Sequence, residues 1–227
     1  MNGVLYGIGV GPGDPGLLTL KAARLIRDCD LLAVPHRDPK QCAALSVAVV
    51  AVPEAKEKQV LAIDMPMTRD ASARERAYAA GARAIEAALD EGKTVAFLTL
   101  GDPSVYSTYG YLQRVLLRAG YDVRTVPGVP SFCAAAAELN APLCLDREPL
   151  HLIPGGEPAE EALALSGVKV FMKGGTESLL RAIKRRGCAA QAVDNCGTDE
   201  QRVYRSAEEI PNDAGYFTVI IVKENEP

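Results

Sequence analysis

The stretch "SARERAYAAGARAIEAALDEGKTVAFLTLGDP" (residues 72–103) decides the fold class of this 227-residue chain. Its first part has helical periodicity, with Ser72 and Glu75 at the spacing of a capping box and Gly92 where a left-handed C-terminal cap belongs. Residues 94–100 are nearly all apolar and rich in β-formers, as in a central strand covered on both faces. A helix that leads directly into a buried strand is typical of an α/β protein with a mainly parallel sheet.

The same alternation continues on both sides of this stretch. Apolar runs predict further strands, and helical spacing predicts helices between them, a pattern that calls for parallel strands joined by helical crossovers. The predicted strands cover residues 4–10, 31–35, 59–63 and 122–129, and the predicted helices cover 17–29, 42–52 and 105–120. These elements give an N-terminal α/β domain, residues 1–140, with a mainly parallel sheet.

The second half of the chain has a different pattern. A small-residue helix at 131–140 is followed by strands at 149–154 and 168–175, a helix at 176–187, and strands at 191–197, 201–207 and 216–222. The last three strands have short connections, which suit antiparallel neighbours because a parallel return needs a longer crossover. We therefore expect a second, smaller α/β domain with a mixed sheet, residues 141–227.

Composition and charge narrow the functional class. The net charge of −4 gives no electrostatic support for a nucleic-acid or membrane-surface role. No apolar run reaches the roughly 18–20 residues that span a bilayer, and we expect no signal peptide. The cysteines are scattered and never form C-x-x-C, so we expect reduced thiols in a cytoplasmic protein and no metal site. They are Cys29, Cys42, Cys133, Cys144, Cys188 and Cys196.

Four unusual loops follow predicted strands. Ligands of open α/β sheets bind beyond the carboxyl ends of the strands, so these loops are the first places to search for a site. They read "GVGPGDPG" (9–16), "GDPSVY" (101–106), "PGVPS" (127–131) and "KGG" (173–175).

The first of these loops has two interpretations. Its glycines would suit a dinucleotide-binding turn, but Pro12 and Pro15 remove two backbone N–H donors from the segment that should hold phosphate. The acidic residue at about the required distance, Asp30, precedes a strand rather than ending one. The other interpretation is that the glycines simply allow a tight turn from strand to helix.

The second loop is more informative. Gly101 lets the backbone approach a ligand closely, and Asp102 supplies an acceptor at the end of a buried strand. Asp102 also suits the N-cap of a helix that begins at Pro103. Spacing leaves both roles of Asp102 open.

Taken together, the loops resemble those of a known family. "GVGPGDPGLLTLKA" (9–22), "FLTLGDPSVYSTYGYL" (97–112) and "VPGVPSFCAAAAELNAPL" (126–143) are similar to the tetrapyrrole methylases, the S-adenosylmethionine-dependent enzymes of cobalamin and sirohaem synthesis. With "VPHRDPK" (34–40), "LGDPSVYSTY" most resembles the members that methylate carbon-20 of precorrin-2 or cobalt-factor II. The similarity covers essentially the whole chain. Leu100 before Gly101 departs from the Gly-Gly-Asp-Pro of many relatives that make precorrin-2.

The resemblance implies a cofactor site. In this family S-adenosylmethionine lies folded in a cleft between the two domains. The positions that match the family's cofactor-binding residues are Pro12, Gly101, Asp102, Val105, Pro130, Ser131, Met172 and, because Cys196 makes the alignment ambiguous, either Cys196 or Gly197. Many relatives carry a threonine at the position of Pro130, so the hydroxyl contact expected there is in doubt. The resemblance also implies a homodimer.

The implied chemistry needs positioning more than a strong base. The methyl carbon of a sulfonium is already electrophilic, and a reduced tetrapyrrole has electron-rich meso carbons. We therefore name no catalytic residue, and Tyr106 is a candidate proton acceptor only through its place beside the loop; it could equally be a buried aromatic at a helix start.

The tetrapyrrole carries many carboxylates, so cations should line its binding trough. His36, Arg37 and Lys40 follow the second strand and either bind acetate or propionate arms or form a solvated charged loop. Lys173, Arg69 and Arg74 are weaker candidates for the same role.

Three hypotheses about function therefore stand. The first is methyl transfer from S-adenosylmethionine to carbon-20 of precorrin-2 or of cobalt-factor II, with the choice between the two left open. The second is methylation at another ring position, or of a different substrate, by the same fold. The third is a Rossmann-type NAD(P) oxidoreductase, against which Pro12 and Pro15 speak.

Overall fold

The computed structural model of the protein describes residues 3–66, 68, 70–155, 157–174 and 176–223. The chain divides into two compact units, residues 1–130 and 131–227, and each is described by itself. None of the described helices is long and apolar enough to cross a membrane.

The first unit is built on a five-stranded sheet with the order β3-β2-β4-β1-β5. Each pairing in this sheet is parallel, which confirms the predicted mainly parallel sheet. The strands are β1 (Val4–Gly9), β2 (Leu31–Val34), β3 (Gln59–Ala62), β4 (Thr94–Thr99) and β5 (Asp122–Val126). β4 lies at the centre, and Val95 to Leu98 are completely buried, as its apolar sequence predicts.

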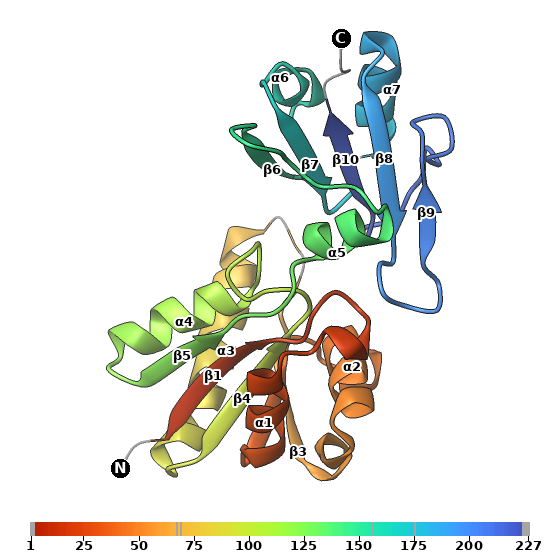
Figure 1. Cartoon of the computed structure of the whole chain (residues 1–227). Helices are drawn as coiled ribbons and strands as arrows, with labels where there is room; N and C mark the ends of the chain where they lie inside the picture. Colours follow the sequence, from red (N-terminus) through yellow and green to blue (C-terminus); the bar gives the residue numbers. More distant parts are fainter. Residues whose placement is uncertain (1–2, 67, 69, 156, 175, 224–227) are drawn as a thin grey trace. The chain divides into compact units, whose positions relative to one another are not determined.

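Helices cover both faces of this sheet (Figure 1). Ile8 and Leu98 pack with helices α1 and α2 on one face, whereas Leu5 and Phe97 pack with α3 and α4 on the other. The alternation of side chains along each strand therefore divides one sheet between two cores. The helical elements are α1 (Leu20–Asp28), α2 (Ala43–Ala51), α3 (Ala71–Asp90), α4 (Tyr109–Arg118) and the short 3₁₀ turns η1 (Pro15–Leu17), η2 (Pro39–Gln41) and η3 (Pro53–Glu57).

The two ends of α3 differ in how well the sequence predicted them. Asp70, not Ser72, caps its start: the Asp70 carboxylate accepts hydrogen bonds from the backbone N–H groups of Ser72 at 2.9 Å and Ala73 at 3.1 Å. The predicted capping box is therefore wrong. At the other end Gly92 has a φ of 81° and donates to the Leu89 carbonyl, which confirms the left-handed cap.

Helix α4 begins later than predicted. The sequence placed its start near Val105, but Tyr106 has a φ of 47° and cannot continue a right-handed helix. The helix starts at Tyr109, so Asp102 is not its N-cap and Pro103 is not its first residue. Its predicted end is confirmed, with Gly120 at a φ of 87°.

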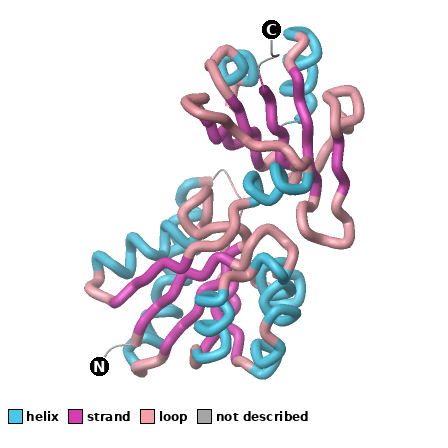
Figure 2. Tube along the Cα trace, viewed as in Figure 1, coloured by secondary structure: helices cyan, strands magenta, loops and turns pink. Residues whose placement is uncertain are grey.

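The second unit is built on another five-stranded sheet, with the order β6-β7-β10-β8-β9 (Figure 2). β6 and β7 are parallel, whereas the pairings β7–β10, β10–β8 and β8–β9 are antiparallel. This arrangement confirms the predicted mixed sheet. The strands are β6 (Leu150–Pro154), β7 (Val168–Met172), β8 (Ala189–Asp194), β9 (Arg202–Tyr204) and β10 (Val219–Lys223).

Among the residues that the structure describes, the second unit has three helices. α7 (Thr176–Arg186), which was predicted, and the short α6 (Ala159–Leu163), which was not, share a core with the sheet. α5 (Ser131–Glu138) packs against β8 and β10 and buries Phe132 and three alanines. The sequence analysis divided the chain after residue 140 and so placed α5 in the first domain; in the structure its contacts group it with the second unit.

Candidate functional site

Four loops meet at the carboxyl edge of the first sheet. Because β2, β4, β1 and β5 are parallel neighbours, the segments that follow them leave the sheet at the same edge. These segments carry the motifs that the sequence singled out. The sheet therefore brings together loops that lie far apart in the sequence, from residue 9 to residue 128.

Three glycines bring the loops after β1, β4 and β5 into backbone contact. A Cβ atom on Gly9 would lie 2.6 Å from the carbonyl oxygen of Gly101 and 2.6 Å from the amide nitrogen of Gly128. A Cβ on Gly128 would overlap the same carbonyl oxygen of Gly101. We call Gly9, Gly101 and Gly128 the glycine junction. At Gly9 and Gly128 a side chain would prevent the backbones from lying this close.

A short antiparallel bridge supports this junction. Gly101 N–H donates to the Gly11 carbonyl at 2.7 Å, and Gly11 N–H donates back to the Gly101 carbonyl at 3.3 Å. Gly11 and Gly101 have φ angles of 80° and 72°, which favour glycine at both positions. On its free side Gly101 has open space, because a Cβ there would meet no atom within 4 Å.

The Asp102 carboxylate lies inside this set of loops and is only 8% exposed. Its Oδ2 accepts a hydrogen bond from Gly128 N–H at 3.0 Å. Its Oδ1 accepts from Ser104 N–H at 2.8 Å and from the Ser104 hydroxyl. Asp102 therefore connects the loop after β4 to the loop after β5, a role that neither sequence interpretation included.

The glycine-rich opening segment is not a phosphate-binding turn that opens directly into a helix. A Cβ on Gly7 would run into the ring of Tyr109, so this glycine makes room for a buried aromatic side chain. Burial raises the pKa of Tyr109, whose hydroxyl donates to the Arg124 carbonyl at 2.9 Å. Pro12 is buried in the turn, and α1 begins only at Leu20. This geometry favours the close-approach interpretation of the loop over the dinucleotide one.

Val105 and Tyr106 complete the loop after β4. Val105 is half-buried, and its N–H donates to the Asp102 carbonyl at 3.2 Å. The Tyr106 side chain is 42% exposed and stands before the helix, so its interpretation as a buried aromatic at the helix start is wrong. Its place beside the loop remains compatible with a role at the site.

The loop after β2 carries the predicted substrate-binding cations. Arg37 and Lys40 are exposed on it, whereas the half-buried His36 is held within the loop, where its Nδ1 lies 2.7 Å from the Asp38 carbonyl oxygen and 3.0 Å from the Asp38 amide nitrogen. Asp38 in turn accepts from Lys40 N–H at 3.1 Å. The loop is therefore shaped by its own hydrogen bonds and presents two cations at the carboxyl edge of the sheet.

The site residues of the second unit also share one edge of a sheet. Met172 ends β7 and is 8% exposed, and Cys196 and Gly197 follow β8. β7 and β8 flank β10, where Val219 pairs with both Met172 and Val193. Ser131, the remaining predicted residue, is the first residue of α5, and Pro130 is half-buried at the end of the first unit.

A side chain that the sequence analysis missed shapes the turn after β8. Gly197 has a φ of 81°, and its N–H donates to Gln201 Oε1 at 2.6 Å. Gln201 Nε2 donates in turn to Glu138 Oε2 at the end of α5, at 2.8 Å. A glutamine four residues after a turn glycine carries no recognisable signal in a single sequence.

Lys173 and Arg74, two of the weaker candidates for binding substrate carboxylates, have other contacts. The ammonium of Lys173 lies 5.7 Å from the ring centroid of Tyr216. The Arg74 guanidinium donates to the Thr68 carbonyl at 2.8 Å, and Arg69 lies outside the described residues. The cysteines are free thiols. Within the described ranges, the structure holds no group of three or more His, Cys, Asp or Glu side chains arranged to bind a metal ion.

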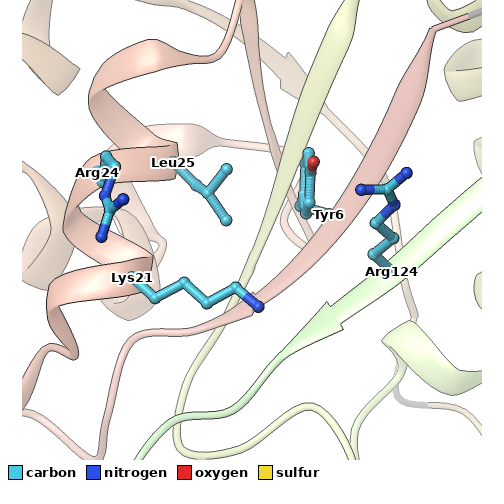
Figure 3. A pocket seen from close by; sticks show the side chains of 5 residues that line it. All are labelled: Tyr6, Lys21, Arg24, Leu25 and Arg124. Atoms are coloured by element: carbon cyan, nitrogen blue, oxygen red, sulfur yellow. The ribbon is translucent and has the colours of Figure 1, made fainter.

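A separate pocket of about 310 Å³ lies on the α1 side of the first sheet (Figure 3). It is lined by Tyr6, Lys21, Arg24, Leu25 and Arg124. The Arg124 guanidinium lies 5.9 Å from the ring centroid of Tyr6. It also forms an ion pair with the Asp122 carboxylate, and the hydrogen bond that it donates there lowers the pKa of Asp122. These lining residues include none of the predicted site residues.

Comparison with known proteins gives a consistent result. Residues 4–211 match the family model described as Tetrapyrrole (Corrin/Porphyrin) Methylases. The chain is 32% identical to the cobalt-precorrin-2 C(20)-methyltransferase of Salmonella typhimurium, over 99% of this chain and 98% of that protein. It is 33% identical to the probable cobalt-precorrin-2 C(20)-methyltransferase of Methanocaldococcus jannaschii, over 96% and 95% of the two chains.

The fold is also found among solved structures. The uroporphyrin-III C-methyl transferase of Thermus thermophilus, solved in complex with S-adenosyl homocysteine, superposes with a TM-score of 0.69 and 24% identity. The alignment covers 98% of each chain. This likeness concerns the fold.

Proposed function

Because this chain belongs to the tetrapyrrole (corrin/porphyrin) methylases, we propose that it transfers a methyl group from S-adenosylmethionine to carbon-20 of precorrin-2 or cobalt-factor II during cobalamin biosynthesis. The observation that carries the proposal is the 32% identity over 99% of the chain to a C(20)-methyltransferase. Both relatives compared above are named for cobalt-precorrin-2, so a cobalt-containing substrate is the first to test.

The loops of the first unit suit a cofactor that is contacted by backbone groups of the protein. Gly101 has open space where a side chain would stand, while its other side is packed against Gly9 and Gly128. Such a loop offers backbone groups at a fixed position to a bound molecule. We assign the cofactor to Pro12, Gly101, Asp102, Val105 and Pro130 of the first unit and to Ser131, Met172, Cys196 and Gly197 of the second. The interdomain cleft stays a prediction.

The bound cofactor supplies an electrophilic methyl carbon on its sulfonium. The new bond forms between this carbon and carbon-20, the carbon–sulfur bond breaks with its electron pair going to sulfur, and carbon-20 loses a proton. The residues of this chain have to hold the two reactants in line, which can contribute up to roughly 7–11 kcal/mol. Tyr106 remains a candidate for the proton acceptor because its exposed side chain follows the Asp102 loop.

Arg37 and Lys40 are proposed to bind carboxylate arms of the tetrapyrrole. Both are exposed on the loop after β2, at the same edge of the sheet as the cofactor loops. Arg37 is suited to a bidentate contact with a carboxylate, and Lys40 to a point contact. His36, which is held by Asp38 within the same loop, would position them rather than reach for the substrate.

The proposal is tested by two measurements on the purified protein. In titration calorimetry S-adenosylhomocysteine should bind, and NADH in the parallel titration should not. Incubation with S-adenosylmethionine and either cobalt-factor II or precorrin-2 should then add one methyl group to the tetrapyrrole, detected by mass spectrometry. Binding of NADH alone would reject the methyltransferase and favour the oxidoreductase alternative.

We further propose that the enzyme is a homodimer in the cytoplasm, with no nucleic-acid or membrane partner. The dimer is expected from the family resemblance, and the compartment from the scattered cysteines of the sequence, which never form C-x-x-C. Light scattering after size exclusion tests the dimer, since a monomeric mass at micromolar concentration would contradict it.

A further inference from the structure

We propose that the Asp102 carboxylate is a positioning group that holds the loop after β4 to the loop after β5. The inference rests on the proposed function, because it concerns the same site, and it gives Asp102 a role in addition to the cofactor contact assigned to it above. Three sets of contacts carry it.

The first is the set of hydrogen bonds that the Asp102 carboxylate accepts. Both of its oxygens accept hydrogen bonds from the protein itself: Oδ2 from Gly128 N–H at 3.0 Å, and Oδ1 from Ser104. Hydrogen bonds to an ionised acceptor are roughly twice as strong as neutral ones. Asp102 as a residue is only 8% exposed, so its carboxylate is held by the protein itself before any ligand binds.

The second is the backbone around the carboxylate. The Gly101 carbonyl accepts from Gly11 N–H, and the same oxygen lies where a Cβ of Gly9 or Gly128 would stand. The glycine junction lets three loops approach one another, but glycines have no side chain that could hold them there. Asp102 supplies the hydrogen bond from the β4 loop to Gly128.

The third is the open side of Gly101. With the carboxylate turned toward Gly128, the loop presents the backbone of Gly101 to open space. The loop therefore has its shape before a ligand arrives, which lowers the ordering cost of binding. Loss of the carboxylate should release Gly128 N–H first and weaken cofactor binding as a consequence.

The experiment measures both effects in the same protein samples. Hydrogen exchange at the Gly128 amide is followed by NMR without ligand, and the Kd of S-adenosylhomocysteine is measured by calorimetry. In Asp102→Ala, which removes both acceptor oxygens, the Gly128 amide should exchange at least about tenfold faster than in wild type, and the Kd should rise about tenfold or more, equivalent to about 1.4 kcal/mol. Ser104→Ala is the matched control: it leaves the Oδ2–Gly128 bond in place, so both quantities should stay within about threefold of wild type.

Three outcomes decide the matter. Unchanged protection of Gly128 in Asp102→Ala, together with weaker S-adenosylhomocysteine binding, would overturn the proposal, because the carboxylate would then act on the ligand. Rapid exchange of Gly128 in the wild-type protein would also overturn it, and this comparison needs no variant that might fail to fold. If Gly128 loses protection in the variant but the wild type binds no S-adenosylhomocysteine, the positioning role stands and the proposed function fails.

Discussion

The loops of the two units hold their shape by different means. In the first unit Gly9, Gly101 and Gly128 bring three loops into backbone contact, and one buried carboxylate, that of Asp102, connects two of them. In the second unit the connection between β8 and β9 is held by one of its own side chains, since Gly197 N–H donates to Gln201 Oε1. Backbone contacts of the first kind tolerate no added atom, whereas a side-chain hydrogen bond can be lost at modest cost.

The largest expected effect is that of Gly128→Ala. The new Cβ would overlap the Gly101 carbonyl and approach the backbone of Gly9, and backbone cannot move aside as a flexible side chain can. We expect a loss of at least about 1–3 kcal/mol of unfolding free energy, measured by urea titration. Gly110→Ala in α4 is the control, because its Cβ would meet no atom within 4 Å and alanine favours a helix by about 0.5–1 kcal/mol. Equal destabilisation of both variants would contradict the glycine junction.

A smaller effect is expected in the second unit for Gln201→Ala. The variant removes the acceptor of Gly197 N–H and the donor to Glu138, and a typical hydrogen bond contributes about 0.5–1.5 kcal/mol. Urea titration should therefore show a loss of about 1 kcal/mol, smaller than that of Gly128→Ala. The neighbouring exposed Glu200 gives the control, since Glu200→Ala should change the stability little. If Gln201→Ala proved the more damaging of the two loop variants, the contrast between the units would fail.

Arg37→Ala should affect the substrate rather than the fold. Arg37 is exposed, so the unfolding free energy should change by less than about 0.5 kcal/mol. Steady-state kinetics should show a rise of about tenfold in the KM for the tetrapyrrole, as expected for one lost charge-assisted contact, with the KM for S-adenosylmethionine nearly unchanged. Lys40→Ala gives a matched comparison on the same loop. Equal rises in both KM values would count against a carboxylate-binding role.

The smallest effect concerns pH and the edge strand β5. A hydrogen bond from Arg124 lowers the pKa of Asp122 in the folded protein, so this pair stabilises the fold above the unfolded pKa of the carboxyl. The contribution should disappear as the pH falls through the lowered folded pKa. Asp122→Asn should therefore reduce the melting temperature slightly at pH 7 and not at pH 2, because exposed ion pairs are weak and screened by salt. A reduction that is the same at both pH values would assign the effect to packing.

Much of the fold followed from periodicity and from glycine. The all-apolar run of β4 predicted a central strand, and Gly92 and Gly120 predicted two helix ends, because these features depend on local sequence. The start of α4 was missed because it depends on Tyr106 adopting a positive φ, which nothing in its sequence neighbourhood requires. The capping box predicted at Ser72 was wrong because the helix begins two residues earlier than the box requires: Asp70 caps it by accepting from the backbone N–H groups of Ser72 and Ala73.

The site was predictable in its position more than in its contacts. The motifs around Gly101 and Gly128 identified loops that the parallel sheet does bring together, since the carboxyl ends of neighbouring strands share an edge. The hydrogen bond from Gly128 to Asp102 joins residues 26 positions apart and depends on the register of three strands. Such contacts leave no periodic signal, so Asp102 was predicted as a cap or a ligand group rather than as the residue that connects two loops.

The most direct test of the proposed function is the position of the transferred methyl group. The enzyme would be incubated with S-adenosylmethionine labelled with ¹³C in its methyl group and with cobalt-factor II or precorrin-2, and the product examined by ¹³C NMR. We expect a single labelled methyl group on carbon-20. A label on another ring carbon would contradict the carbon-20 assignment while keeping the family, and a product without label would contradict methyl transfer to these tetrapyrroles altogether.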